Sequence, residues 1–158
     1  MSAPESFRLP WSGRGVDYDE EDIAAVVEAM RMADPLTHGT YLHQFESDFS
    51  QYHGGVWSFA VASCTAALEL VATLTRIGPG DEVIIPAHTY CSTAIPFARR
   101  GARIVWADIH PEYRVSTAQT IEPLITKKTK VIVAVHLYGL AVPMQEICDI
   151  ARDRGVLV

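Results

Sequence analysis

The sequence predicts an α/β fold, an incomplete three-layer sandwich built around a mostly parallel sheet. From residue 56 onward, short runs rich in Val, Ile and Ala alternate with helix-like segments, which is the pattern of parallel strands joined by helices. The runs are apolar at nearly every position, as is typical of strands covered on both faces. No helix follows the last run, 156–158, in this sequence. We therefore expect a sheet that lacks its remaining strands.

Residues 1–55 are expected to form an N-terminal arm followed by two helices. Acidic residues at 17–20 suit the start of the first helix. Its apolar residues recur at helical spacing: Ile23, Val26, Val27 and Met30. Pro35 and Gly39 lie in the break that follows. The second helix shows a similar apolar stripe and ends near 54–55: Leu42, Phe45, Phe49 and Tyr52.

Residues 56–158 are expected to form the sheet and the helices that cover it. Strands are predicted at 56–62, 82–86, 103–107, 130–135 and 156–158. Helices are predicted between them at 65–75, 92–100, 120–126 and 144–154. Proline is costly deep inside a helix, so the third of these helices should begin just before Pro123. Gly155 stands where a helix-ending glycine belongs.

Composition narrows the class of partner. The net charge of −6 at pH 7 argues against nucleic acid, and we find no apolar stretch long enough to span a membrane. Residues 1–7 do not resemble a secretory signal. Three dispersed cysteines and six dispersed histidines indicate neither a disulfide framework nor a metal site. We expect a cytoplasmic protein with a small-molecule ligand.

The segment Ser63-Cys64-Thr65-Ala66 joins a predicted strand to a predicted helix. The first backbone N–H groups of a helix lack partners and, with the helix dipole, can bind an anion such as phosphate. An equally good interpretation is that Ser63 or Thr65 only caps the helix. At this point both interpretations stay open.

Ligands of such sheets bind beyond the carboxyl ends of the strands. Two of the predicted loops there carry residues suited to a planar ligand. Tyr90 could stack on an aromatic ring, or it could simply cover the end of the sheet. His136 and Tyr138 follow the strand predicted at 130–135. A single loop histidine more often has a structural role.

Seven pieces of the chain, in order, resemble the DegT/DnrJ/StrS family of pyridoxal-phosphate-dependent aminotransferases. They are Gly39-Thr40-Tyr41 with Phe45-Glu46, Ser63-Cys64-Thr65-Ala66-Ala67-Leu68, Gly78-Pro79-Gly80-Asp81-Glu82-Val83-Ile84-Ile85-Pro86, Thr89-Tyr90, Ala107-Asp108-Ile109, Ile125-Thr126 with Thr129-Lys130, and Val135-His136-Leu137-Tyr138-Gly139. Their order and spacing across 36–158 carry the resemblance. It implies that 56–158 is the N-terminal part of the large domain of a fold-type I enzyme, truncated in its last strand.

The resemblance also implies roles for individual residues. Thr65 and Ala66 match positions that hold the cofactor phosphate, and Tyr90 matches the aromatic position that stacks on the pyridine ring. Cys64 adjoins the phosphate site but departs from the Gly or Ala that is common there. We add three candidates for a substrate-binding or active-site loop: Gly39, His136 and Tyr138. No metal ligand is implied.

An aminotransferase needs a Schiff-base lysine, and this chain has three lysines, Lys127, Lys128 and Lys130. All three lie at the amino end of the strand predicted at 130–135, whereas the loops of the cofactor site follow carboxyl ends. The resemblance places the catalytic lysine beyond Val158, and it places an acid that pairs with the pyridine nitrogen just after the strand that begins at Val156. We therefore expect this chain alone to be inactive.

The resemblance implies a homodimer that moves an amino group from glutamate or glutamine to a keto-sugar, often nucleotide-linked, or to a cyclitol-type acceptor in polysaccharide or antibiotic biosynthesis. Two alternatives stay open: a pyridoxamine-phosphate-dependent sugar dehydratase of the same family, and a non-catalytic ligand-binding or regulatory module. A dinucleotide-binding domain is disfavoured, because the turn at 62–66 contains no glycine.

Overall fold

The computed structural model describes residues 17–35 and 37–158, and the chain divides into two compact units, Met1–Ala60 and Val61–Val158. The boundary expected between residues 55 and 56 lies close to this division and remains a proposal. Within the described residues, we find no helix with the length and apolar character needed to cross a bilayer.

The first unit contains two helices, α1 (Glu20–Met32) and α2 (Thr40–Tyr52). Asp19 caps α1: its carboxylate accepts the N–H groups of Glu21 and Asp22, both at 2.9 Å. The Asp22 carboxylate accepts the Asp19 N–H in return at 3.2 Å, which completes a capping box. Both predicted helices are confirmed, and neither contains a buried residue.

The strand predicted at 56–62 is wrong, since no part of this segment has strand structure. A strand is stabilised by a ladder of hydrogen bonds with a neighbour, and no described residue pairs with this segment as a neighbouring strand. Instead the Glu46 carboxylate on α2 accepts the N–H of Ala60 at 2.8 Å.

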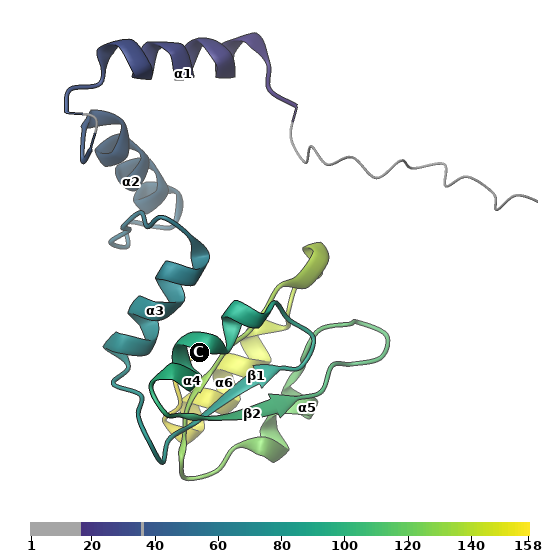
Figure 1. The fold of residues 1–158 in the computed structure, drawn as a ribbon. Coiled ribbons are helices and arrows are strands. Elements are labelled where there is room, and N and C mark those ends of the chain that lie inside the picture. The colour runs from purple at the N-terminus through teal and green to yellow at the C-terminus, as the bar shows by residue number, and fades with distance from the viewer. Residues whose placement is uncertain (1–16, 36) are drawn as a thin grey trace, which may run out of the picture. The chain divides into compact units, whose positions relative to one another are not determined.

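The second unit is built on a parallel sheet (Figure 1). Its strands are β1 (Glu82–Pro86), β2 (Arg103–Ala107) and β3 (Thr129–Ile132), in the order β2-β1-β3. Leu157 adds a parallel bridge to Val131 on the far side of β3. The predicted strands at 82–86 and 103–107 are confirmed, whereas the strand predicted at 130–135 begins one residue earlier and ends at Ile132.

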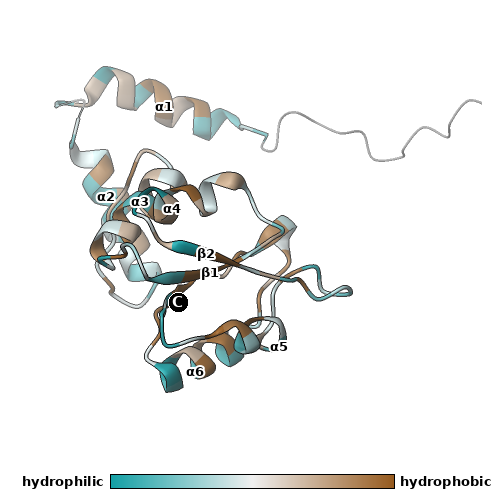
Figure 2. Ribbon diagram, turned by 60° about the horizontal axis from the view of Figure 1, so that its bottom comes forward, coloured by the Kyte–Doolittle hydropathy of each residue, from teal (hydrophilic) through white to brown (hydrophobic). Residues whose placement is uncertain are grey.

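Helices cover both faces of this sheet (Figure 2). On one face lie α3 (Cys64–Leu74) and α4 (Ile95–Arg99), the latter preceded by the 3-10 turn η1 (Cys91–Thr93). On the other lie α5 (Ala118–Ile121), the turn η2 (Glu122–Leu124) and α6 (Met144–Arg154). A further 3-10 turn, η3 (Leu137–Gly139), follows β3.

The core has two parts, one on each face of the sheet. Ile84 of β1 packs with Ile121 and Ile147 on the α5/α6 face. Its neighbours Val83 and Ile85 belong to the cluster on the α3/α4 face, with Phe97. This alternation along one strand shows burial on both faces and confirms the expected three-layer α/β architecture.

Prolines lie at two predicted helices whose bounds differ from expectation, and a glycine ends the helix whose bounds are confirmed. The helix predicted at 92–100 is split, and Pro96 lies in the first turn of α4, where its missing N–H costs nothing. The helix predicted at 120–126 begins earlier, at Ala118, and Pro123 falls in the 3-10 turn η2. The helix at 144–154 is confirmed, and Gly155 ends it in the left-handed region with φ 67°.

Candidate functional site

The carboxyl ends of the parallel strands define one edge of the sheet, which we call the carboxyl edge, with the segments after β1, β2 and β3 (87–91, 108–114 and 136–142). The loops after β1 and β3 meet there, because the rings of His88 and Tyr138 lie edge to face with centroids 5.8 Å apart. Sheets of this type bind ligands at such an edge.

The first turn of α3 is capped by Ser63. Ser63 is extended (φ −166°, ψ 161°), and its Oγ accepts the N–H of Ala66 at 3.1 Å. Its carbonyl oxygen accepts the N–H of Ala67 at 3.1 Å. The described residues supply no acceptor for the N–H groups of Cys64 and Thr65. The capping interpretation therefore holds for Ser63, and two donors of the first turn stay available for an anion.

Tyr90 lies in the loop between β1 and α4 and is 72% exposed. The backbone of this loop is fixed on both sides of the ring: Ala87 N–H donates to the carbonyl of Ala107 at 2.8 Å, and Thr93 N–H donates to the carbonyl of Tyr90 at 3.0 Å. The hydroxyls of Thr89 and Thr93 are 2.9 Å apart. An open aromatic face on a held backbone is suited to stacking on a planar ligand.

His136 shapes the loop after β3. Its Nδ1 accepts the N–H of Val142 at 3.0 Å, which closes the segment 136–142. Its side chain also lines a hollow of about 250 Å³ with Leu68 and Val71 of α3. The structure thus brings the His136 loop beside α3, and the described hydrogen bond gives His136 a structural role.

Gly39 belongs to the first unit, where it is the N-cap residue of α2. A Cβ at this position would collide with the backbone carbonyl oxygen of Pro35. Local space therefore accounts for the glycine, and its expected place in an active-site loop remains a prediction.

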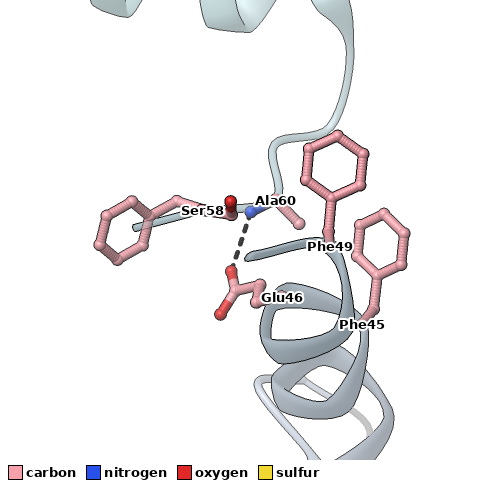
Figure 3. A pocket seen from close by; sticks show the side chains of 6 residues that line it. Phe45, Glu46, Phe49, Ser58 and Ala60 are labelled. Carbon is pink, nitrogen blue, oxygen red and sulfur yellow. Dashed lines mark hydrogen bonds between the residues drawn. The ribbon is translucent and has the colours of Figure 1, made fainter. Parts of the chain in front are cut away.

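The first unit also holds a hollow of about 310 Å³ lined by Phe45, Phe49 and Phe59. At this hollow the Glu46 carboxylate accepts the hydrogen bond from the Ala60 N–H (Figure 3).

A larger hollow of about 680 Å³ lies between the loops after β2 and β3 and reaches α6. His110, Tyr113 and Glu146 are among its lining residues. None of the candidate residues Thr65, Ala66, Tyr90, His136 and Tyr138 lines it. Size alone therefore does not identify the candidate site.

The three lysines lie at the opposite, amino edge of the sheet. Lys130 Nζ is 3.1 Å from Asp81 Oδ1, and Asp81 directly precedes β1. The hydrogen bond from Lys130 and that from the Gly78 N–H hold the pKa of the Asp81 carboxyl below its usual range. Lys127 and Lys128 stand in the turn before β3. The expected placement of the three lysines at the amino end of this strand is confirmed.

One candidate residue, His88, escaped the sequence analysis. Its contact with Tyr138 joins segments that are far apart in the chain, so no local pattern marks it. Only its position two residues before Tyr90, on a loop at the carboxyl edge, could have drawn attention to it.

Comparison with known proteins places the chain in a family. The model of the DegT/DnrJ/EryC1/StrS aminotransferase family matches residues 16–158. The UDP-4-amino-4-deoxy-L-arabinose–oxoglutarate aminotransferase of Shewanella sediminis is 35% identical over 85% of this chain and 34% of its own length. The GDP-perosamine synthase of Caulobacter vibrioides is 37% identical over 96% of this chain and 40% of its own.

The structure is also similar to solved aminotransferases of fold-type I. NtdA from Bacillus subtilis, solved with bound cofactor PMP, has a TM-score of 0.80 at 31% identity, over 88% of this chain and 33% of that one. Two other similar structures are the PMP and PLP forms of one protein, the 'putative sugar aminotransferase Spr1654' of Streptococcus pneumoniae, each with a TM-score of 0.77 at 32% identity, over 90% of this chain and 36% of that one. The chain spans between a third and two fifths of the length of the two relatives. The sequence comparisons and the structural comparisons agree, and the chain belongs to the DegT/DnrJ/EryC1/StrS aminotransferase family.

Proposed function

We propose that this chain is the N-terminal part of a pyridoxal-phosphate-dependent aminotransferase whose amino donor is glutamate or glutamine. The acceptor is a keto-sugar, often nucleotide-linked, or a cyclitol-type ketone. The names of the relatives support a sugar-nucleotide acceptor, since they include a GDP-perosamine synthase and a UDP-4-amino-4-deoxy-L-arabinose aminotransferase. The proposal includes a homodimer of the longer protein, which sedimentation of that protein tests.

The observation that carries the proposal is the first turn of α3, together with the Tyr90 loop at the carboxyl edge. The free N–H groups of Cys64 and Thr65 and the Thr65 hydroxyl are donors suited to the cofactor phosphate. Ala66 would join them when its N–H leaves Ser63 Oγ. Because η1 contacts α3, Tyr90, which directly precedes η1, lies near this helix and would stack on the pyridine ring.

Pyridoxal phosphate supplies an electron sink for the substrate carbanion. The residues of this chain bind and orient that group, but none supplies the amine that a transaminase needs. Lys130 forms an ion pair with Asp81 at the amino edge, and Lys127 and Lys128 directly precede β3. We infer that the 158-residue chain holds the phosphate and ring side of the site and does not turn over.

Two measurements test this proposal. In a transamination assay with added pyridoxal phosphate, glutamate and a keto-sugar nucleotide, the chain should show no turnover above that of free cofactor. Appreciable turnover would overturn the proposal that the chain is inactive alone. In a titration followed by amide NMR, pyridoxal phosphate should shift the signals of Thr65 and Tyr90. Thr65→Val and Tyr90→Ala should each weaken this binding, whereas the exposed-surface variant Gln119→Ala should leave it unchanged.

A non-catalytic ligand-binding module is the second candidate, favoured by the placement of the lysines at the amino edge. Extending the chain with the sequence that follows Val158 in its gene discriminates the two. Gain of turnover, lost again when a later lysine is replaced by alanine, supports the aminotransferase. Cofactor binding without turnover in the extended protein supports the module.

A further inference from the structure

The two loops that carry Tyr90 and Tyr138 are joined by one aromatic contact. The His88 ring, two residues before Tyr90, meets the Tyr138 ring at an interplanar angle of 61° with centroids 5.8 Å apart. His88 follows β1 and Tyr138 follows β3, so the contact bridges the carboxyl ends of two paired strands. Edge-to-face pairs at this separation are attractive beyond the area that they bury.

Tyr138 adopts a conformation that aromatic residues rarely take. Its backbone is left-handed (φ 53°, ψ 33°), and Gly139 continues in the same region with φ 78°. Tyr138 is 82% exposed, so burial in a core does not offset the cost of this backbone. Such strain persists only where surrounding contacts fix the residue, and it concentrates at functional sites. Among the described residues, the aromatic partner of the Tyr138 ring is His88.

The backbone around Tyr90 is held from three directions. The bond from Ala87 N–H to Ala107 ties the loop to β2, and the Thr89–Thr93 bond ties it to η1. The His88–Tyr138 contact ties it to the segment after β3. Removal of Tyr138 would leave the β3 side of this loop without that side-chain contact.

We infer that Tyr138 is a positioning residue, which acts through His88 to hold the loop that presents the Tyr90 ring to the cofactor. The inference rests on the proposed function for the role of Tyr90. The pairing itself fixes the backbone of the loop whether or not a ligand is bound. A loop whose backbone is already fixed loses less freedom on binding, so the contact favours cofactor affinity.

The test is the backbone order of residues 89–91, measured by NMR relaxation in the 158-residue chain. Tyr138→Gly removes the ring and suits the left-handed backbone, so the fold should be retained. We expect amide order parameters near 0.85 in the wild-type loop and a fall toward 0.6 in Tyr138→Gly and in His88→Ala. The double variant should show no further fall, and Tyr138→Phe should keep the wild-type order.

The chain offers a matched control. His110 and Tyr113 form a stacked pair with centroids 4.3 Å apart within the single loop after β2. Tyr113→Ala removes a His–Tyr contact that joins no second loop, and it should leave residues 89–91 unchanged. Unchanged order in Tyr138→Gly and His88→Ala, or an equal loss in Tyr113→Ala, would overturn the positioning role.

A second measurement separates this inference from the proposed function. Tyr138→Gly should weaken pyridoxal phosphate binding about two- to tenfold, which is the range for one aromatic pair, and inorganic phosphate should perturb Thr65 as in the wild type. If pyridoxal phosphate shifts neither Thr65 nor Tyr90 in the wild-type chain, the proposed function fails, while the loop order still decides the role of Tyr138. If the wild-type chain binds pyridoxal phosphate and Tyr138→Gly binds it equally well, the positioning role fails and the proposed function stands.

Discussion

Ser63 occupies the extended position before α3, and its hydroxyl accepts the hydrogen bond that the proposed phosphate would take from Ala66. Ser63→Ala should therefore lower the free energy of unfolding by about 1 kcal/mol and speed amide exchange of Ala66. Inorganic phosphate should restore the protection of that amide more in the variant than in the wild type, because no hydroxyl competes. Hydrogen exchange with and without phosphate measures both effects. Ser63→Thr, which keeps the hydroxyl, is the control, and unchanged Ala66 exchange in Ser63→Ala would contradict the cap.

Asp81 makes the free energy of unfolding depend on pH, and the direction of its pKa shift gives the sign of that dependence. The hydrogen bonds from Lys130 and from the Gly78 N–H lower its pKa in the folded state. The stabilisation is thus fully present above the pKa of the unfolded carboxyl, about 3.9, and is lost as pH falls through the folded-state pKa. The difference in unfolding free energy between the wild type and Asp81→Asn, measured with urea, should be constant down to about pH 4 and should shrink below that pH. NMR titration should show a higher Asp81 pKa in Lys130→Gln; an unmoved pKa would remove Lys130 as its cause.

Residues of the candidate site could be predicted from sequence where local backbone decides them. Ser63 and Thr65 follow an apolar run and open a helix, so a cap and an anion site were alternative interpretations, and the structure shows a Ser63 cap and two amides without an acceptor in the same turn. His88 could not be predicted, because its partner Tyr138 comes from a different loop. Side-chain contacts between loops depend on strand order, which the β2-β1-β3 arrangement supplies and the linear sequence does not.

At the scale of elements, sequence periodicity predicted the helices and strands whose pattern is local. The strands at 82–86 and 103–107 and the helix at 144–154 have the predicted bounds. The segment 56–62 has an equally good strand pattern but no strand structure. Strand propensity describes how side chains fit a sheet and does not provide the neighbouring strand. The split of the helix at 92–100 follows from Pro96, whose ring does not suit a helix interior.

The end of α6 gives a prediction for a whole element. Gly155 is left-handed (φ 67°), and a Cβ there would meet no atom within 4 Å, so any cost of Gly155→Ala is backbone strain. We expect a loss of about 1–2 kcal/mol in unfolding free energy, measured by urea denaturation. Gly78→Ala is the matched control, because its Cβ also meets no atom within 4 Å and its φ is not left-handed. It should be neutral or stabilise by up to about 1 kcal/mol; equal losses in both variants would contradict the strain.

At the scale of the whole molecule, the two units differ in what they bury. Among the described residues, α1 and α2 contain no buried side chain, and apolar residues such as Met30 (76%) and Trp57 (91%) are largely exposed. The second unit holds both apolar clusters, whose buried members run from Ala72 to Val156. The free energy from apolar burial therefore belongs mainly to the second unit.

This division predicts that residues 61–158 fold without the first unit. All the buried members of both clusters are retained in that piece, so its unfolding free energy should match that of the same transition in the full chain within about 0.5 kcal/mol. Urea unfolding followed by circular dichroism measures both. Phe97→Ala, which opens a cavity at a fully buried position, serves as an internal standard and should cost about 3–5 kcal/mol in either length. Loss of a cooperative transition in 61–158, or a smaller Phe97→Ala effect there, would show that the core depends on residues of the first unit.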